Sequence, residues 1–184
     1  KKSIKYFERA ASHDFVYAFN NLGKIYEKKK EFNKAFELYL KSANLEESWA
    51  CNKIGEMYRL GIGTNIDLKK AFEYYTKALE VPIDYLENYA KYNLAVYFYM
   101  YGNYEATIEK DEEKAIKLLA ESSEKLIDSQ MYLLAYYISK NDEKNILKYK
   151  NMIENNPKFN NEIKEKIEKK LINIKKNCDL KIEL

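Results

Sequence analysis

The sequence predicts an all-α fold, an α/α superhelix in which antiparallel helix pairs form a right-handed solenoid that ends in a C-terminal capping helix. Only five of the 184 residues are Gly and two are Pro, whereas residues with high helix propensity dominate. Short patterns recur along the chain, and their apolar positions fall at i, i+3, i+4 and i+7, as on an amphipathic helix. Such helix pairs bury their apolar faces by stacking on their neighbours.

The first repeated pattern marks the first helix of each pair. It places an Ala, an aliphatic residue four positions later, a small residue directly after that, and an aromatic residue four beyond the aliphatic one. In the last copy, Leu134 and Ala135 take the places of Leu22 and Gly23. The copies are AFNNLGKIY from Ala18, ACNKIGEMY from Ala50, AKYNLAVYF from Ala90 and a degenerate QMYLLAYYI from Gln130.

The second repeated pattern marks the second helix. Its copies are KAFELYLKSA from Lys34, KAFEYYTKAL from Lys70, KAIKLLAESS from Lys114 and KNILKYKNMI from Lys144. The opening KSIKYFERAA, at 2–11, has the same form without a partner helix. We therefore expect a single helical-repeat domain over 1–184. It consists of a half repeat at 1–13, repeats near 14–45, 46–82, 83–127 and 128–155, and a charged capping helix at 158–177.

A Gly-x-Gly loop separates the two helices of the second repeat. Gly61 is expected to end the first helix in the left-handed conformation, and Asp67 to cap the second helix. Asp111 and Asn141 hold the matching place in later repeats, and Glu31 is a poorer cap in the first. A dinucleotide-binding loop needs a preceding strand and a third glycine close behind. Because both are missing, we interpret the loop as a bend.

The segment from Ala50 to Ala78 carries the full pattern A-x-x-x-[LI]-G-x-x-Y-x-x-G-x-G-T-x-x-D-x-x-K-A-F-x-Y-Y-x-K-A. This pattern resembles the Sel-one-like repeat, a branch of the tetratricopeptide-repeat superfamily. The segment from Ala18 to Ala43 matches without the loop, the match from Ala90 onward is one of shape alone, and the last helix lies outside it. The resemblance implies an α/α superhelix that mediates protein–protein contact, usually with no activity of its own.

Small residues are predicted where the two helices of a pair cross. Tyr26 and Tyr58, one turn beyond the crossing, are expected to pack between adjacent repeats. The small residues are Gly23, Gly55, Ala95 and Ala135, facing Ala35, Ala71 and Ala115.

The sequence offers little for catalysis, and we predict that the protein is not an enzyme. His13, the single histidine, lies between two predicted helices with no Ser, Cys or Asp tied to it by a motif. Cys51 and Cys178 are far apart, so no disulfide framework, metal site or cofactor site is expected. The lysines of 158–176 alternate with glutamates, and the net charge is only +3. These features give no indication of direct nucleic-acid binding.

The candidate binding site is the concave face, which the first helices are expected to line. An extended peptide or partner helix would lie along it, with Asn20 and Asn52 as amide anchors and aromatic residues as packing surface. An equally open alternative is that the tyrosines only fill the inside of a tightly wound solenoid. The candidate residues are Asn20, Lys24, Trp49, Asn52, Glu56, Tyr89, Tyr92, Tyr132 and Tyr136.

The sequence favours a binding scaffold or adaptor for a protein or peptide. The alternative is a peptide-sensing regulatory domain, since the chain begins within a repeat and an upstream DNA-binding or catalytic part would fit that start. No apolar run approaches the roughly 20 residues that span a bilayer, so no membrane partner is expected. Cysteine usage favours a reducing, cytoplasmic location, with export as the alternative if a signal peptide precedes Lys1. The partner and the oligomeric state stay open.

Overall fold

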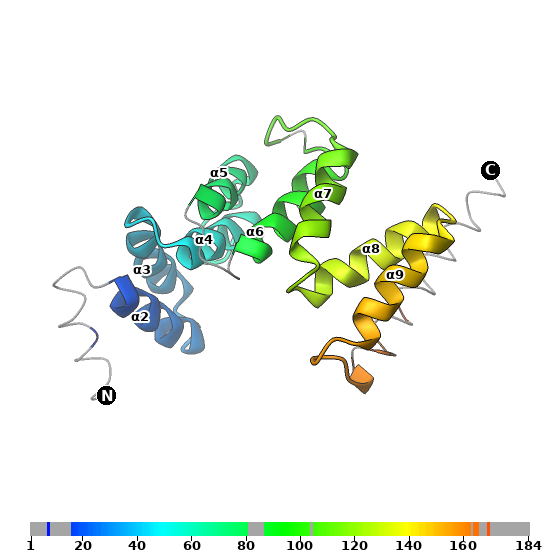
Figure 1. Cartoon of the computed structure of the whole chain (residues 1–184). Coiled ribbons are helices and arrows are strands. Elements are labelled where there is room, and N and C mark those ends of the chain that lie inside the picture. The colour runs from blue at the N-terminus through cyan, green and yellow to red at the C-terminus, as the bar shows by residue number, and fades with distance from the viewer. Residues whose placement is uncertain are drawn as a thin grey trace. The chain divides into compact units, whose positions relative to one another are not determined.

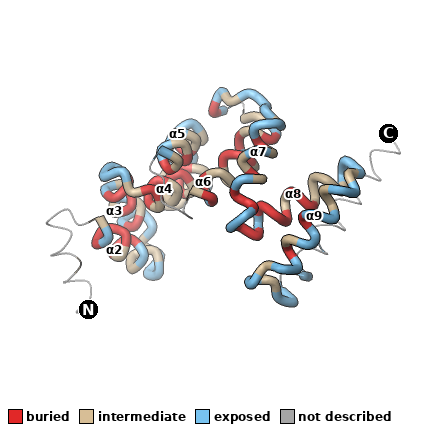
Figure 2. Tube along the Cα trace, viewed as in Figure 1, coloured by how far each residue is buried: buried red, intermediate tan, exposed pale blue. Residues whose placement is uncertain are grey.

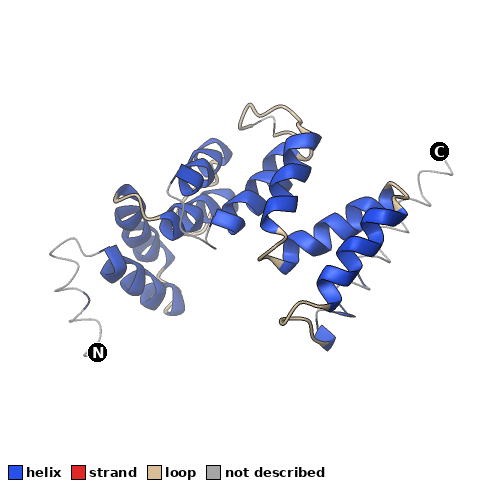
Figure 3. Cartoon of the chain, in the orientation of Figure 1, coloured by secondary structure: helices blue, strands red, loops and turns tan. Residues whose placement is uncertain are grey.

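The computed structural model describes residues 7, 16–80, 87–103, 105–162, 164–165 and 169. In this part of the chain the backbone forms eight α-helices and one π-helical turn, with an isolated bridge between Asn103 and Ile108 and no strand (Figures 1 and 3). The all-α prediction is confirmed. The half repeat predicted at 1–13, apart from residue 7, and most of the capping helix predicted at 158–177 lie outside the described residues. The chain divides into two compact units, Lys1–Ala115 and Ile116–Leu184.

Unit 1 is built from consecutive helix pairs. Helix α2 lies beside α3, and α4 lies beside α5 (Figure 1). Helix α4 also packs against α3 before it and α6 after it, so the pairs form a continuous stack. Its elements are α2 (Val16–Lys28), α3 (Phe32–Asn44), α4 (Ser48–Leu60), α5 (Leu68–Glu80), α6 (Glu87–Leu94), the π-helical turn η1 (Ala95–Tyr99) and the start of α7 (Glu112–Ser122).

Unit 2 contains the rest of α7 and one complete pair, α8 (Ile127–Ser139) and α9 (Glu143–Glu154). The two helices of the pair are joined by ring stacking, since the Tyr137 and Tyr149 rings lie 5.7 Å apart and nearly parallel. A buried hydrogen bond of 2.7 Å runs from Gln130 Nε2 to the carbonyl oxygen of Ser123 and ties α8 to the end of α7.

The Gly-x-Gly loop is a bend, as predicted. Gly61 ends α4 with φ 68° and ψ 33°, and its N–H donates to the carbonyl oxygen of Met57. Asp67 caps α5, because its Oδ1 accepts the backbone N–H of Lys70 at 2.9 Å. Asp111 caps α7 in the same way through Lys114. Glu31 makes no side-chain cap bond, which confirms that it is the poorer cap.

The fourth repeat corrects the predicted register by one residue. The cap of α9 is Asp142 rather than Asn141, since the Asp142 carboxylate accepts the backbone N–H of Asn145. The Asp142 N–H donates to the carbonyl oxygen of Tyr137, as Glu31 does to Tyr26. Fully buried Leu133 therefore takes the place of Leu22, and Leu134 that of Gly23.

The third repeat carries one extra residue, and η1 absorbs it. Gly102 lies eight positions after Leu94, whereas Gly61 lies seven positions after Ile54. The N–H of Met100 donates to the carbonyl oxygen of Ala95, five residues back, which is the π-helical pattern. After this turn the register is restored.

Contacts identify Tyr99, rather than Phe98, as the counterpart of Tyr58. Each of the two carbonyl oxygens accepts the N–H of the aspartate that caps the next helix, Asp111 in one case and Asp67 in the other. The rings also match, since Tyr58 meets Phe36 edge-on and Tyr99 meets Phe72 edge-on. Tyr58 lies between α3 and α5, where its ring also stacks on Tyr74, which confirms its predicted packing between repeats.

The glycines of α2 and α4 make room for buried tyrosines. A Cβ atom on Gly55 would lie 2.8 Å from the ring of Tyr75, and one on Gly23 would overlap the ring of Tyr39. Both tyrosines are fully buried. Figure 2 colours the buried residues along these helices red. The predicted close crossing is therefore present, but the nearest atoms to the glycines belong to tyrosines rather than to the alanines of the second helices.

We expect Gly55→Ala to lower the free energy of unfolding by about 1–3 kcal/mol, because the added methyl group collides with a ring that has no space to move. The third repeat has Ala95 and Leu119 at the corresponding positions. In a Tyr75→Leu background, Gly55→Ala should therefore lower the free energy of unfolding by much less. Denaturant titration of the four proteins measures this coupling. An equal cost in both backgrounds would show that the ring is not the reason for the glycine.

Replacing Asp67 by Ala should lower the free energy of unfolding by about 1 kcal/mol at neutral pH, because a cap bond is lost. The Lys70 backbone N–H holds the pKa of Asp67 below its usual range. The difference in the free energy of unfolding should therefore be at its full size above the usual pKa of aspartate. It should disappear as the pH falls through the lowered pKa of Asp67 in the folded protein. Glu31→Ala, at a cap without this bond, is the control and should cost less. Denaturant titrations across the acid range check both, and a loss that persists in strong acid would contradict the assignment.

Candidate functional site

The concave face predicted from the sequence corresponds in unit 1 to the surface shared by α2, α4, α6 and η1, which we call the first-helix surface. Side-chain contacts join each of these helices to the next. They comprise a capping carboxylate, a stacked lysine, an ion-pair network, an amide pair and a stacked arginine.

Trp49 and Lys24, both predicted site residues, lie together. The Lys24 ammonium is 4.5 Å from the centre of the Trp49 ring, so a cation–π contact joins α2 to the start of α4. The buried ring of Tyr39 also meets the indole edge-on, at 5.3 Å between ring centres. Trp49 is thus in contact with a buried ring of α3 and with an exposed lysine of α2.

Asn20 supports this surface from beneath instead of forming its exposed layer. It is only 7% exposed, and its Nδ2 donates to Glu47 at 2.9 Å. The same Glu47 carboxylate oxygen accepts the backbone N–H of Ala50 at 2.7 Å and so caps α4. A single carboxylate therefore both starts α4 and attaches it to α2.

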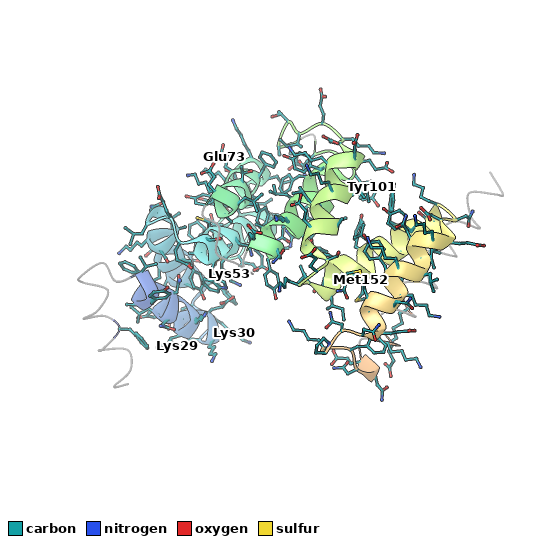
Figure 4. The ribbon with its side chains drawn as sticks, in the orientation of Figure 1. Lys29, Lys30, Lys53, Glu73, Tyr101 and Met152 are labelled. Atoms are coloured by element: carbon teal, nitrogen blue, oxygen red, sulfur yellow. The ribbon has the colours of Figure 1, made fainter. Side chains whose placement is uncertain are left out.

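Lys53, labelled in Figure 4, is the centre of an ion-pair network. Its Nζ lies 2.9 Å from Glu27 on α2 and 3.0 Å from Glu56 on α4. Burial lowers the pKa of the Lys53 ammonium, but the two carboxylates outweigh it and the net shift is upward. Glu27 also accepts the Tyr39 hydroxyl at 2.9 Å. The predicted site residue Glu56 is therefore engaged within the chain.

Asn52 lies on the surface, half-buried, with its amide oxygen occupied. Asn93 Nδ2 donates to Asn52 Oδ1 at 3.0 Å and so links α4 to α6. The amide nitrogen of Asn52 keeps its two donors for other partners.

Arg59 is held flat on an aromatic ring. Its Cζ lies 3.8 Å from the centre of the Tyr97 ring in η1. Arg59 also interacts with the fully buried Tyr75. Burial raises the pKa of the Tyr75 hydroxyl to about 12, and the arginine partly offsets this rise. Tyr75 Oη and Arg59 Nε are both buried and stop short of a hydrogen bond of standard geometry.

The remaining predicted residues divide between the units. Tyr89 is 43% exposed, and Tyr92 is half-buried on the same helix, α6. Tyr132 and Tyr136 lie on α8 in unit 2, where the Tyr136 ring contacts Tyr137 at 5.1 Å. The structure thus brings Lys24 and Trp49 into contact, places Tyr89 and Tyr92 on the neighbouring helix α6, and describes the candidates of unit 2 separately.

Sequence reasoning missed several residues of this surface. It considered the positions five before, two before and two after the aliphatic residue of each copy, whereas Lys53 and Asn93 directly precede that residue. Their shared position was the available signal. The others could be found only from contacts. The missed residues are Glu27, Glu47, Lys53, Arg59, Asn93 and Tyr97.

The described residues contain no group of three or more His, Cys, Asp or Glu placed to hold a metal ion. A separate pocket of about 280 Å³ opens near the ends of α3 and α5 and is partly lined by Cys51. The Cys51 thiol is buried and contacts the Ala43 carbonyl oxygen at 3.6 Å, and burial raises its pKa to about 11. This environment suppresses the thiolate that a nucleophile requires. His13 and Cys178 lie outside the described residues.

No helix in the described ranges combines the length and apolar character needed to cross a membrane.

The stacked helix pairs and the contacts of the first-helix surface define a helical-repeat protein with an aromatic and charged face. The model of the Sel1 repeat family matches residues 1–15, 19–46, 50–80 and 88–125. This is more than half of the chain, and the protein belongs to the Sel1 repeat family.

Solved structures agree with this assignment. The crystal structure of a Sel1 repeat protein from Oxalobacter formigenes is 26% identical, with a TM-score of 0.69, and the match covers 83% of this chain and 64% of that one. A protective antigen present in uropathogenic Escherichia coli strains, displaying an SLR fold, is 20% identical with the same TM-score. That match covers 81% of this chain and 32% of that one and shows the fold alone. The chain thus spans less than two thirds of either protein.

No curated protein matches the chain. Proteins with Sel1 repeats generally serve as protein–protein interaction scaffolds, and the solenoid is typically non-catalytic. The family match and the structural matches confirm the family and the fold class inferred from the sequence.

Cys51 should react slowly with a thiol reagent at neutral pH in a Cys178→Ser variant, where it is the only cysteine. Because burial raises its pKa to about 11, the rate should climb as the pH approaches that value and rise sharply at neutral pH once denaturant unfolds the chain. Absorbance assays of labelling measure these rates. Rapid labelling of the folded protein at pH 7 would show that the thiol is accessible and activated.

Proposed function

We propose that this protein is a non-catalytic scaffold that binds an extended peptide segment of a partner protein along the first-helix surface of unit 1. The observation that carries the proposal is a row of aromatic residues at one register position of three successive first helices. Tyr17 is 76% exposed and Tyr89 is 43% exposed, with half-buried Trp49 between them in the sequence of repeats. Large aromatic rings left in water at matching positions are typical of binding surfaces.

The polar groups of the surface suit a peptide backbone. Asn52 offers amide donors beside the aromatic row, and its oxygen is fixed by Asn93. Asn20 acts indirectly, because its amide holds Glu47 and thereby the start of α4. These ties preorganise the surface, which lowers the entropic cost of binding.

The alternative interpretation is that the tyrosines only pack. It fits Tyr39 and Tyr75, which are fully buried, and it does not account for the exposure of Tyr17 and Tyr89. For Tyr132 and Tyr136 on α8, contact with a partner stays a prediction.

Site-specific photo-crosslinking tests the proposal. A benzophenone amino acid replaces Tyr17 or Tyr89 on the first-helix surface, or Tyr101 as a control. Tyr101, labelled in Figure 4, is 77% exposed, as Tyr17 is at 76%, but it lies in the loop after η1. We expect one partner protein to crosslink from Tyr17 and Tyr89 and not from Tyr101.

The crosslinks should weaken about tenfold when Trp49→Ala removes the ring between the two probes, because aromatic anchors dominate such interfaces. Circular dichroism confirms that this variant is folded. Equal crosslinking from Tyr101, or crosslinks that do not respond to Trp49→Ala, would contradict a binding site on the first-helix surface.

A further inference from the structure

The charges of the first-helix surface are unequally satisfied. All four carboxylates on α2, α4 and α6 and at the cap of α4 have a partner within the chain. Glu27 and Glu56 share Lys53, Glu47 accepts Asn20 and the Ala50 N–H, and Glu87 pairs with Lys91 at 3.0 Å.

The cations of the same helices are in excess. In the described part of unit 1, Lys24, Lys28 and Arg59 have no carboxylate partner. Lys24 and Lys28 are flexible and exposed. Arg59 differs, because its guanidinium is fixed against the Tyr97 ring at 3.8 Å, and Tyr97 itself stays 37% exposed.

The choice of arginine at this position is itself informative. The sequence contains only two arginines, Arg9 and Arg59, and uses lysine at its other basic positions. A planar guanidinium stacks on an aromatic face and presents paired N–H donors that match a carboxylate, which an ammonium group does not. It is also less strongly hydrated and so costs less to bury in an interface.

The buried side of Arg59 also lacks a full set of partners. Its Nε and the Tyr75 hydroxyl, both buried, form no hydrogen bond of standard geometry with any described group. The stacked Tyr97 ring fixes the orientation of the guanidinium but takes none of its N–H donors in its plane. The side chain is thus oriented in advance, and no carboxylate of the described residues forms an ion pair with it.

We propose that Arg59 is the anchor for an acidic side chain, Asp or Glu, of the partner segment that binds the first-helix surface. This inference rests on the proposed function and adds the chemical class of the partner. Tyr97 and Tyr75 act as positioning residues, since they hold the guanidinium flat. Lys24, over Trp49, adds long-range attraction for the same acidic segment.

Binding of the full 184-residue chain to pools of degenerate peptides tests this inference. The pools are identical except for one fixed residue, which is Glu, Gln or Lys. We expect the Glu pool to bind about tenfold more tightly than the Gln pool, and the preference to shrink as salt is raised. Arg59→Gln should abolish the preference, and Arg59→Glu should transfer it to the Lys pool. Lys69→Gln, at an exposed position on α5, is the control and should leave the preference unchanged.

The possible outcomes separate the two proposals. Pools that bind and lose affinity with Trp49→Ala, but show no preference for Glu, would overturn the role of Arg59 and leave the binding surface intact. A Glu preference that survives in folded Arg59→Gln would also overturn it. Arg59→Lys, which keeps the charge but not the planar stack, should retain part of the preference if the arginine acts as described. Failure of every pool to bind would count against both proposals.

Discussion

The first-helix surface depends on how closely the two helices of each pair approach one another. In the first two repeats, a fully buried tyrosine ring of the second helix lies where a glycine of the first helix has no side chain. This contact sets the spacing of α2 from α3 and of α4 from α5. It also places the hydroxyl of each tyrosine beside a charged residue of the first helix, Glu27 in one pair and Arg59 in the other. The packing of the core and the charge on the surface are therefore linked through the same two rings.

Polar contacts between consecutive first helices then determine what the surface presents. Glu47 and Lys53 are the main ties between α2 and α4, and each is satisfied by groups from both helices. Between α4 and α6, the Asn52–Asn93 pair takes this role. Because these groups are used internally, they stiffen the surface and leave aromatic rings and unpaired cations as the parts available to a partner. A partner therefore binds to the groups that the contacts between repeats do not use.

Much of this could be predicted from the sequence, because helix pairing follows from local patterns. The copies from Ala18 and Ala50 indicate α2 and α4, and those from Lys34 and Lys70 indicate α3 and α5. Asp67 and Asp111 identify the starts of α5 and α7. The pattern did not reveal η1, since Phe98 fits the aromatic position by counting alone and the extra residue shows only in the distance to Gly102. In the fourth repeat, the adjacent residues Leu133 and Leu134 allowed two registers, and the backbone hydrogen bond to Tyr137 decides between them.

The candidate site was harder to predict, because its contacts join residues far apart in the chain. Asn20 has the residue type of a peptide clamp, yet a glutamate 27 positions later engages its amide. Arg59 belongs to no repeated pattern in the sequence. Its role can be inferred only from its contacts with Tyr97 and Tyr75 in the structure. Side-chain type indicates what a residue can bind, whereas the stacking of repeats decides which groups remain available.

Hydrogen–deuterium exchange of the protein with and without a bound partner peptide tests most directly whether the first-helix surface is the binding site. The bound peptide should slow exchange in α2, α4 and α6 and leave exchange in α3 and α5 nearly unchanged. Protection confined to the second helices, or to the loop around Tyr101, would contradict it.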